Sequence, residues 1–165
     1  MEKNSIIFVL GCIVGLIFST GCATPFEQQL KSAKAGNAFA QYHVAMVYGT
    51  GTGGTLGGDI PVEKDIDKAV YWLEKSHRAG NGKATLALGL CYYYHLGVIR
   101  DYDNYENAFK LFKQAEEKGI TDVYLWLGEC YLKGRGVDQD ENIAVDYFKK
   151  GSDQANETAK YCMAE

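Results

Sequence analysis

The feature that most constrains this chain is a unit that occurs three times and starts a fourth time. Each copy has a glycine that is followed four residues later by a small or β-branched residue. The glycines are Gly36, Gly80 and Gly119, and the residues four positions on are Ala40, Ala84 and Val123. Together with Ala159 in the incomplete fourth copy, these positions are spaced by 44, 39 and 36 residues. Such periods are typical of helical hairpins that stack side by side, because one hairpin cannot bury its apolar stripe alone.

Each copy contains two segments with the periodicity of a helix. The second segment has apolar or small residues at i, i+3, i+4 and i+7, which lie on one face of a helix. These sets are Ala69, Trp72, Leu73, Ser76; Ala108, Leu111, Phe112, Ala115; and Ala144, Tyr147, Phe148, Gly151. The first segment keeps Ala45, Gly89 and Gly128 at one position, although glycine costs a helix about 1 kcal/mol relative to alanine. The sequence therefore predicts an all-α fold, an α-solenoid of stacked helix–turn–helix repeats with a close helix crossing at that position.

The repeat positions also predict the organisation of the chain. The three repeats are expected at 36–79, 80–118 and 119–154. Residues 155–165 are expected to be a partial repeat that forms a C-terminal capping helix, and 22–35 an N-terminal segment that includes a polar capping helix. A solenoid needs such ends, because an uncovered stacking face would aggregate.

Residues 1–21 have the pattern of an export signal. An uncharged apolar run at 6–18 follows Lys3, which is the length of a signal-peptide core and short for a bilayer span. Small residues then precede Cys22, and this resembles a bacterial lipobox, which implies cleavage before Cys22 and its acylation by palmitate or a similar chain. Ser19 stands where a lipobox has leucine, so an ordinary signal peptide or an uncleaved anchor is the alternative. We therefore expect a lipid-anchored protein of the bacterial cell envelope, on the outer membrane facing the periplasm because Ala23 follows the cysteine.

The motifs within the repeats resemble the Sel-one-like repeat (SLR) family over about residues 36 to 165. The matching elements are Leu127-Gly128 with Tyr131, the loop Gly134-Arg135-Gly136-Val137, and Asp65-Ile66-Asp67-Lys68-Ala69 with Trp72. The resemblance implies stacked helix pairs that bind another protein or a peptide, as an adaptor or as an immunity protein that neutralises an effector. Tetratricopeptide repeats are the alternative fold, but their period is about 34 residues and they lack the Gly-x-Gly-Val loop.

Charge and motif spacing argue against several other functions. A net charge of −4 provides no basic face for nucleic acid. The glycine-rich run at 49–58 lacks the preceding strand and the Gly-Lys-Ser/Thr ending of a phosphate loop, so we expect an enlarged turn. His43, His77 and His95 have no helical metal-site spacing. We therefore expect no catalytic residue, metal or cofactor, and we do not expect an enzyme.

The cysteines of the repeats are expected to be buried thiols. Cys91 and Cys130 each lie one residue before the tyrosine of the motif. The resemblance implies that cysteine-rich family members tie the two helices of a repeat with a disulfide, but the second helices here contain no cysteine. Both thiols are therefore interpreted as small apolar groups, and Cys162 lies near the chain end.

Four tyrosines outside the motif are the candidate protein-binding residues. They are Tyr93, Tyr94, Tyr102 and Tyr105, and Asp101, Asp103 and Glu106 are interleaved with them. Exposed tyrosine provides a large contact area, and the acidic residues would favour a basic partner. The alternative is that these rings pack among themselves. The expected function is a membrane-anchored scaffold that binds a protein or peptide, with a cell-wall-active enzyme or a purely structural envelope component as alternatives.

Overall fold

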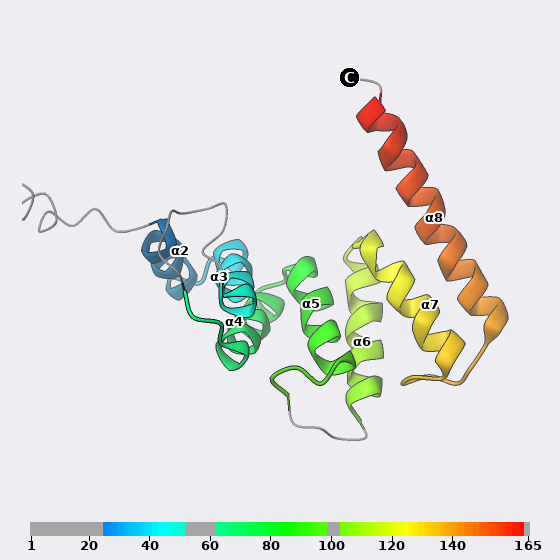
Figure 1. Cartoon of the computed structure of the whole chain (residues 1–165), viewed down its shortest axis with the longest axis horizontal. Helices are drawn as coiled ribbons and strands as arrows, with labels where there is room; N and C mark the ends of the chain where they lie inside the picture. Colours follow the sequence, from blue (N-terminus) through cyan, green and yellow to red (C-terminus); the bar gives the residue numbers. More distant parts are fainter. Residues whose placement is uncertain (1–24, 52–61, 99–102, 164–165) are drawn as a thin grey trace, which may run out of the picture.

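The fold is an open row of helices without a shared centre (Figure 1). The computed structural model describes residues 25–51, 62–98 and 103–163, with the side chains described from residue 26 to residue 155. Its elements are α2 (Pro25–Lys34), α3 (Ala38–Thr50), α4 (Ile66–Arg78), α5 (Gly82–Tyr93), α6 (Asn104–Glu117), the 3-10 turn η1 (Thr121–Val123), α7 (Tyr124–Lys133) and α8 (Glu141–Met163). These residues contain no strand, which confirms the predicted all-α solenoid. The predicted signal peptide and Cys22 lie outside the described residues.

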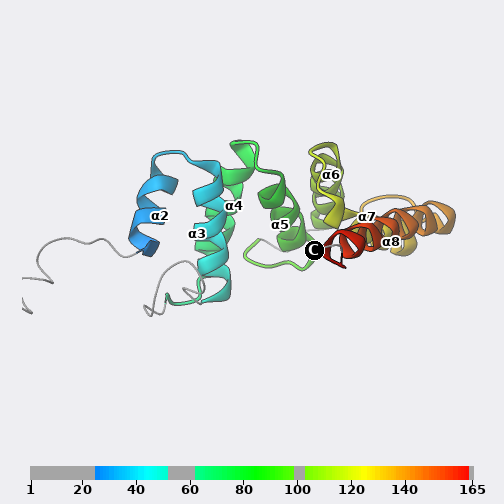
Figure 2. The same cartoon turned by 90° about the horizontal axis from the view of Figure 1, so that it is seen from above.

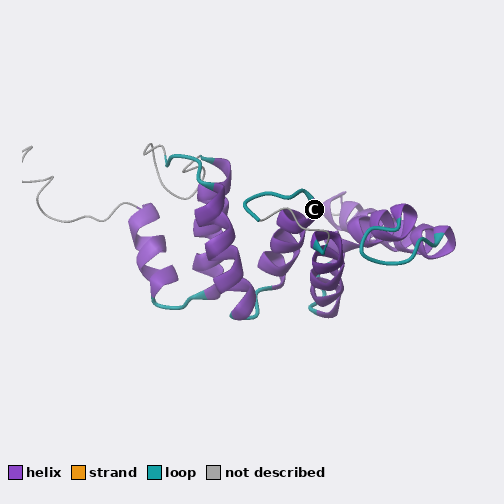
Figure 3. Ribbon diagram, turned by 90° about the horizontal axis from the view of Figure 1, so that it is seen from below, coloured by secondary structure: helices purple, strands orange, loops and turns teal. Residues whose placement is uncertain are grey.

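Each repeat is one antiparallel helix pair that stacks on the next. The pairs α3/α4, α5/α6 and α7/α8 pack most extensively, while α2 packs on α3 and α4 packs on α5. Seen from above, the helix pairs follow one another in chain order along the molecule (Figure 2), and among the residues drawn in colour in the view from below there are helices and loops but no strand (Figure 3). Two apolar clusters fill the interior, one around Val44 and Leu88 and one around Phe112 and Leu127. The core therefore runs along the row, as it does in other repeat proteins.

Glycine and asparagine set the turns between the first repeats. Gly36 and Gly80 have φ of 97° and 91°, a left-handed conformation that glycine adopts without the cost of a side chain. The next residues, Asn37 and Asn81, cap the following helices: their Oδ1 atoms accept hydrogen bonds from the backbone N–H of Ala40 at 2.9 Å and Ala84 at 3.1 Å. The predicted starts of the first two repeats therefore coincide with turns between helices in the structure.

The C-terminal end differs from the prediction. We expected a separate capping helix over residues 155–165, but α8 runs without interruption from Glu141 to Met163, and Figure 1 shows it continuing well past α7. Ala155 occupies the repeat position of the turn glycines Gly80 and Gly119. Because alanine disfavours the left-handed conformation and favours a helix, the chain does not turn there.

The predicted close crossing is present and has a specific cause. A Cβ atom on Gly128 would lie 2.5 Å from Cε1 of Phe148, and one on Gly89 would lie 2.7 Å from Cε1 of Phe112. Each phenylalanine ring of a second helix thus packs directly on the backbone of the first helix in its own repeat. In the first repeat the equivalent positions hold Ala45 and the smaller Leu73. A larger residue on the first helix, alanine in place of glycine, is therefore accompanied by a smaller residue on the second helix, leucine in place of phenylalanine.

Gly128→Ala should lower the free energy of unfolding by about 1–3 kcal/mol, because the new methyl group forces the Phe148 ring to move. Gly151→Ala is the matched control, since its Cβ would meet only Cβ of Tyr124, at an ordinary 3.6 Å. This control should be neutral or stabilise by up to about 1 kcal/mol through helix propensity. Urea unfolding followed by circular dichroism measures both; equal effects of the two substitutions would contradict the close crossing.

Candidate functional site

The first helix of each repeat has an outward stripe opposite its buried face. In α3 the buried residues include Ala40 and Val44, so Phe39, His43 and Met46 point away from the core. Phe39 is 63% exposed and Met46 is 41% exposed, and the rings of Phe39 and His43 lie 4.2 Å apart between centroids. This helix therefore presents large apolar side chains to solvent.

The same positions carry aromatic residues further along the row. By repeat equivalence, His43 corresponds to Trp126 in α7, and Thr50 corresponds to Tyr94, which caps α5. The rings of Tyr94 and Trp126 meet edge to face with centroids 5.8 Å apart. Tyr94 is 52% exposed, and the neighbouring Leu125 is 54% exposed. The outward stripes of α5 and α7 thus meet in one aromatic patch.

Tyr42 of α3 belongs to the same outward stripe and is half-buried. Burial is the larger cause of the raised pKa of Tyr42 in α3, and the negative charge of Asp122, at the start of the third repeat, raises that pKa further. By repeat equivalence, the outward stripes of α3, α5 and α7 occupy the corresponding side of each first helix. We call this surface the first-helix face, and its main residues are Phe39, Tyr42, His43, Met46, Leu90, Tyr94, Leu125 and Trp126.

The structure separates the four tyrosines that the sequence grouped together. The prediction that Tyr93 is an exposed binding residue is wrong: it is 3% exposed and its ring packs against Phe112 and Trp126. Tyr94 is exposed on the first-helix face, as expected, and Tyr105 is half-buried beside Tyr93. Tyr102 lies outside the described residues.

Arg135 helps to bury Tyr93, and no pattern in the sequence marks this contact. Its guanidinium donates a hydrogen bond of 2.7 Å to the hydroxyl of Tyr93 and lies 4.9 Å from the ring centroids of both Tyr93 and Tyr105. The next residue, Gly136, has φ of 74°, and a side chain there would overlap the backbone carbonyl of Tyr105. The Gly-Arg-Gly-Val loop of the third repeat therefore packs against the second repeat. The two glycines of this loop are the sequence feature that could have predicted such a close approach.

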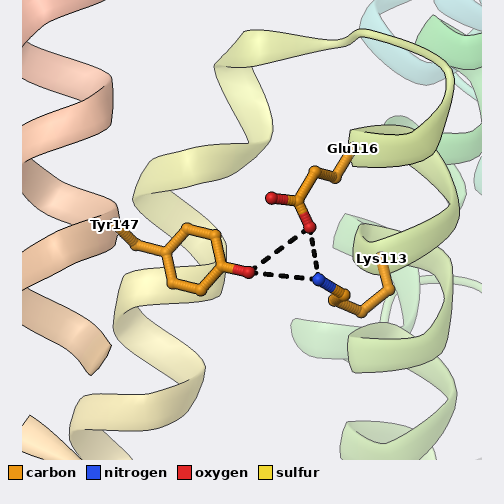
Figure 4. A network of polar contacts seen from close by, with 3 residues as sticks. All are labelled: Lys113, Glu116 and Tyr147. Carbon is orange, nitrogen blue, oxygen red and sulfur yellow. Dashed lines mark hydrogen bonds and ion pairs between the residues drawn. The ribbon is translucent and has the colours of Figure 1, made fainter.

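A polar network joins the second helices of the last two repeats (Figure 4). Lys113 in α6 forms an ion pair with Glu116 and donates a hydrogen bond of 3.1 Å to the hydroxyl of Tyr147 in α8, which in turn donates to Glu116 at 3.3 Å. These partners raise the pKa of the Lys113 ammonium, with the hydrogen bond to Glu116 as the largest cause. A lysine held in its protonated form is not a nucleophile or a base. The network therefore connects neighbouring repeats.

The histidines are not gathered into a metal site. His77 lies within hydrogen-bond distance of Thr85, with Nδ1 3.0 Å from its hydroxyl, and Nδ1 of His95 lies 3.1 Å from the side-chain amide of Asn104. Among the described residues, no group of three histidine, cysteine or acidic side chains could hold a metal ion. Of the glycine-rich run, residues 49–51 end α3 with Gly51 as its left-handed cap, and 52–58 lie outside the described residues.

The repeat cysteines lie in apolar surroundings, as expected. Cys130 is completely buried and Cys91 is half-buried, and both are free thiols. Burial raises the pKa of the Cys91 thiol to about 11 and that of Cys130 to about 12. Both groups are therefore neutral near pH 7, whereas a catalytic cysteine requires a thiolate. Cys162 lies beyond the residues whose side chains are described.

Within the described part of the chain, no helix combines the length and the apolar character that crossing a membrane requires.

A family model described as the Sel1 repeat matches residues 38–81, 82–120 and 122–156. The chain is 26% identical to the chitin synthase regulator SKT5 of Saccharomyces cerevisiae, over 81% of this chain and 18% of that protein. It is 30% identical to the ERAD-associated E3 ubiquitin-protein ligase component HRD3B of Arabidopsis thaliana, over 68% of this chain and 16% of that protein. The chain thus spans less than a fifth of the length of either relative.

A solved structure shows the same arrangement of helices. The Sel1 repeat protein from Oxalobacter formigenes superposes with a TM-score of 0.68 at 29% identity, covering 78% of this chain and 47% of that chain. The three family matches span the helix pairs α3/α4, α5/α6 and α7/α8. The chain therefore belongs to the Sel1 repeat family, whose repeats form helical scaffolds for protein–protein interaction.

Proposed function

We propose that this protein binds a partner protein or peptide through the first-helix face, while a lipid on Cys22 holds it at a bacterial membrane. The observation that carries the binding proposal is the set of large apolar side chains exposed along the first helices of the three repeats. Phe39, Tyr94 and Leu125 are each more than half exposed. Aromatic and apolar groups of this kind supply most of the affinity in protein interfaces.

The charges of the first-helix face favour an apolar contact over electrostatic attraction. Its outward stripes carry Lys83, Asp122, Glu129 and Lys133, which sum to no net charge. Glu129 and Lys133 also pair with each other at 2.5 Å. Charge therefore excludes neither acidic nor basic partners at this face, and the rings select a partner that presents its own apolar side chains.

The curated relatives support an interaction role. One is named as a regulator of chitin synthase, and another as a component of a ubiquitin ligase. Each name describes a protein that acts on or within an assembly. For this chain we propose the equivalent role at the cell envelope, as an adaptor or as an immunity protein that neutralises an effector.

The proposed tether would place the start of the solenoid close to the membrane. Only two residues separate Cys22 from Pro25, the first residue of α2. A trans peptide chain extends by at most about 3.6 Å per residue, so α2 would begin within about 11 Å of the acylated residue. Lipid chains at about 0.8 kcal/mol per buried CH₂ would make the attachment stable when two or more are present.

Replacing Phe39, Tyr94 and Leu125 together by alanine should weaken capture of the partner more than tenfold, because loss of central apolar contacts costs about 1–4 kcal/mol. The protein is crosslinked in its native host, the captured proteins are identified by mass spectrometry, and the affinity of the main partner is measured. The control replaces Tyr71 and Val145, which are similarly exposed on the second helices α4 and α8, and should bind normally. Unchanged capture by the triple variant would contradict a role for the first-helix face.

Cys22→Ala should abolish incorporation of a radioactive fatty acid into the protein, because that thiol is the proposed attachment site. Labelling is carried out in the native host and followed by gel electrophoresis and autoradiography. Cys12→Ala is the control and should keep its label, since Cys12 lies within the apolar run. Label that persists on Cys22→Ala would assign the acyl group elsewhere or remove the lipoprotein proposal.

A further inference from the structure

A groove lies on the other side of α5 from the first-helix face. It has a volume of about 380 Å³ and is bounded by α4 on one side and α6 on the other, with α5 beneath. Leu88 and Tyr92 of α5 face this groove, and the helix period places them about half a turn away from Leu90 and Tyr94. The groove and the first-helix face are therefore separate surfaces.

The floor of the groove is apolar and has a defined length. Leu88 and Leu111 are buried beneath it and Tyr92 is half-buried. Leu88 and Tyr92 are one helical turn apart, a rise of about 6 Å. In an extended peptide, side chains two residues apart lie on the same face and are separated by about 6.6 Å. Two apolar side chains of an extended segment, at positions i and i+2, therefore match the floor.

Two cationic side chains and one carboxylate line the rim of the groove. Arg78 and Lys110 stand on opposite walls and Glu74 is the acidic residue of the lining. Arg78 pairs with Glu74 at 3.3 Å and Lys110 pairs with Glu106 at 2.7 Å, but both pairs are exposed to solvent and therefore weak. A carboxylate placed between the walls can take part in either pair.

His77 adds a hydrogen-bond acceptor to the wall formed by α4. The Thr85 hydroxyl donates to the backbone carbonyl of Asn81 at 3.0 Å and accepts from the Lys118 ammonium at 3.0 Å. The hydroxyl has thus used its one proton and one of its two lone pairs, and the second lone pair can only accept a hydrogen bond. Nδ1 of His77, 3.0 Å from the hydroxyl oxygen, therefore carries a proton and donates to Thr85. Burial, together with Lys118 and Arg78, lowers the pKa of His77, so its ring is neutral near pH 7. Nε2 of His77 is then an acceptor.

The wall formed by α6 provides neutral amides. Asn107 and Gln114 lie in one line along the groove, at i and i+7, with Lys110 between them. Amide side chains both donate and accept, so they match the N–H and C=O groups of an extended peptide backbone. The groove thus combines groups for backbone pairing, an apolar floor and a cationic rim.

We propose that this groove binds a short extended segment of a partner protein with the pattern apolar–acidic–apolar. The two apolar side chains lie over Leu88 and Tyr92, and the intervening carboxylate points to the rim, where Arg78 and Lys110 bind it. Asn107, Gln114 and His77 pair with the backbone of the segment. This surface is independent of the first-helix face, so the protein can hold two segments at once.

The test uses two fluorescein-labelled peptides, acetylated and amidated at their ends, whose central sequences are Gly-Leu-Asp-Leu-Gly and Gly-Leu-Asn-Leu-Gly. Fluorescence anisotropy measures their binding to the full chain in detergent micelles, up to a few millimolar protein. The aspartate peptide should bind at least about threefold more tightly than the asparagine peptide. Lys110→Glu should weaken the aspartate peptide about tenfold or more and leave the asparagine peptide nearly unchanged.

The control variants separate this groove from other surfaces. Lys149→Glu makes the same charge change at an exposed residue of α8 and should leave the binding of both peptides unchanged. The triple alanine variant of the first-helix face should bind the aspartate peptide normally. Absence of binding, equal affinity for both peptides, or equal effects of Lys110→Glu and Lys149→Glu would each overturn the proposal, and none of these results would affect the proposed function of the first-helix face.

Discussion

The structure depends on how closely the two helices of each repeat approach one another. In the second and third repeats a phenylalanine ring packs against the backbone of a glycine, as in the pair Phe148 and Gly128. Close-packed interiors leave no room for even one additional methyl group at such a crossing. Because each pair has a fixed geometry, one side of its first helix packs in the core. The opposite side of that helix faces solvent.

This geometry gives the molecule two different surfaces. The outward positions of α3, α5 and α7 carry rings and apolar chains such as Phe39 and Tyr94, which suit a large apolar interface. On the other side of α5, the second helices α4 and α6 stand apart and form a groove with a charged rim. Both surfaces are formed by side chains of successive repeats, so substitutions at a few positions can change a partner without changing the fold.

The repeat pattern predicted the helix pairs and the close crossing, because both depend on the spacing of apolar and small residues within one repeat, which can be read from the sequence. Contacts between repeats were harder to predict. Tyr93 is buried because Arg135, some forty residues later, covers its ring, and no local pattern contains that information. The continuous α8 could have been predicted, since Ala155 replaces the glycine that ends the earlier second helices.

A double-mutant cycle on Gly128 and Phe148 tests the helix crossing most directly. Each single change, Gly128→Ala and Phe148→Leu, should destabilise the protein, the first by overlap and the second by leaving a cavity. Combined, they recreate the pair found in the first repeat, Ala45 with Leu73. The account predicts that the double variant is more stable than the sum of the single effects by at least about 1 kcal/mol. Additivity within about 0.5 kcal/mol would contradict it.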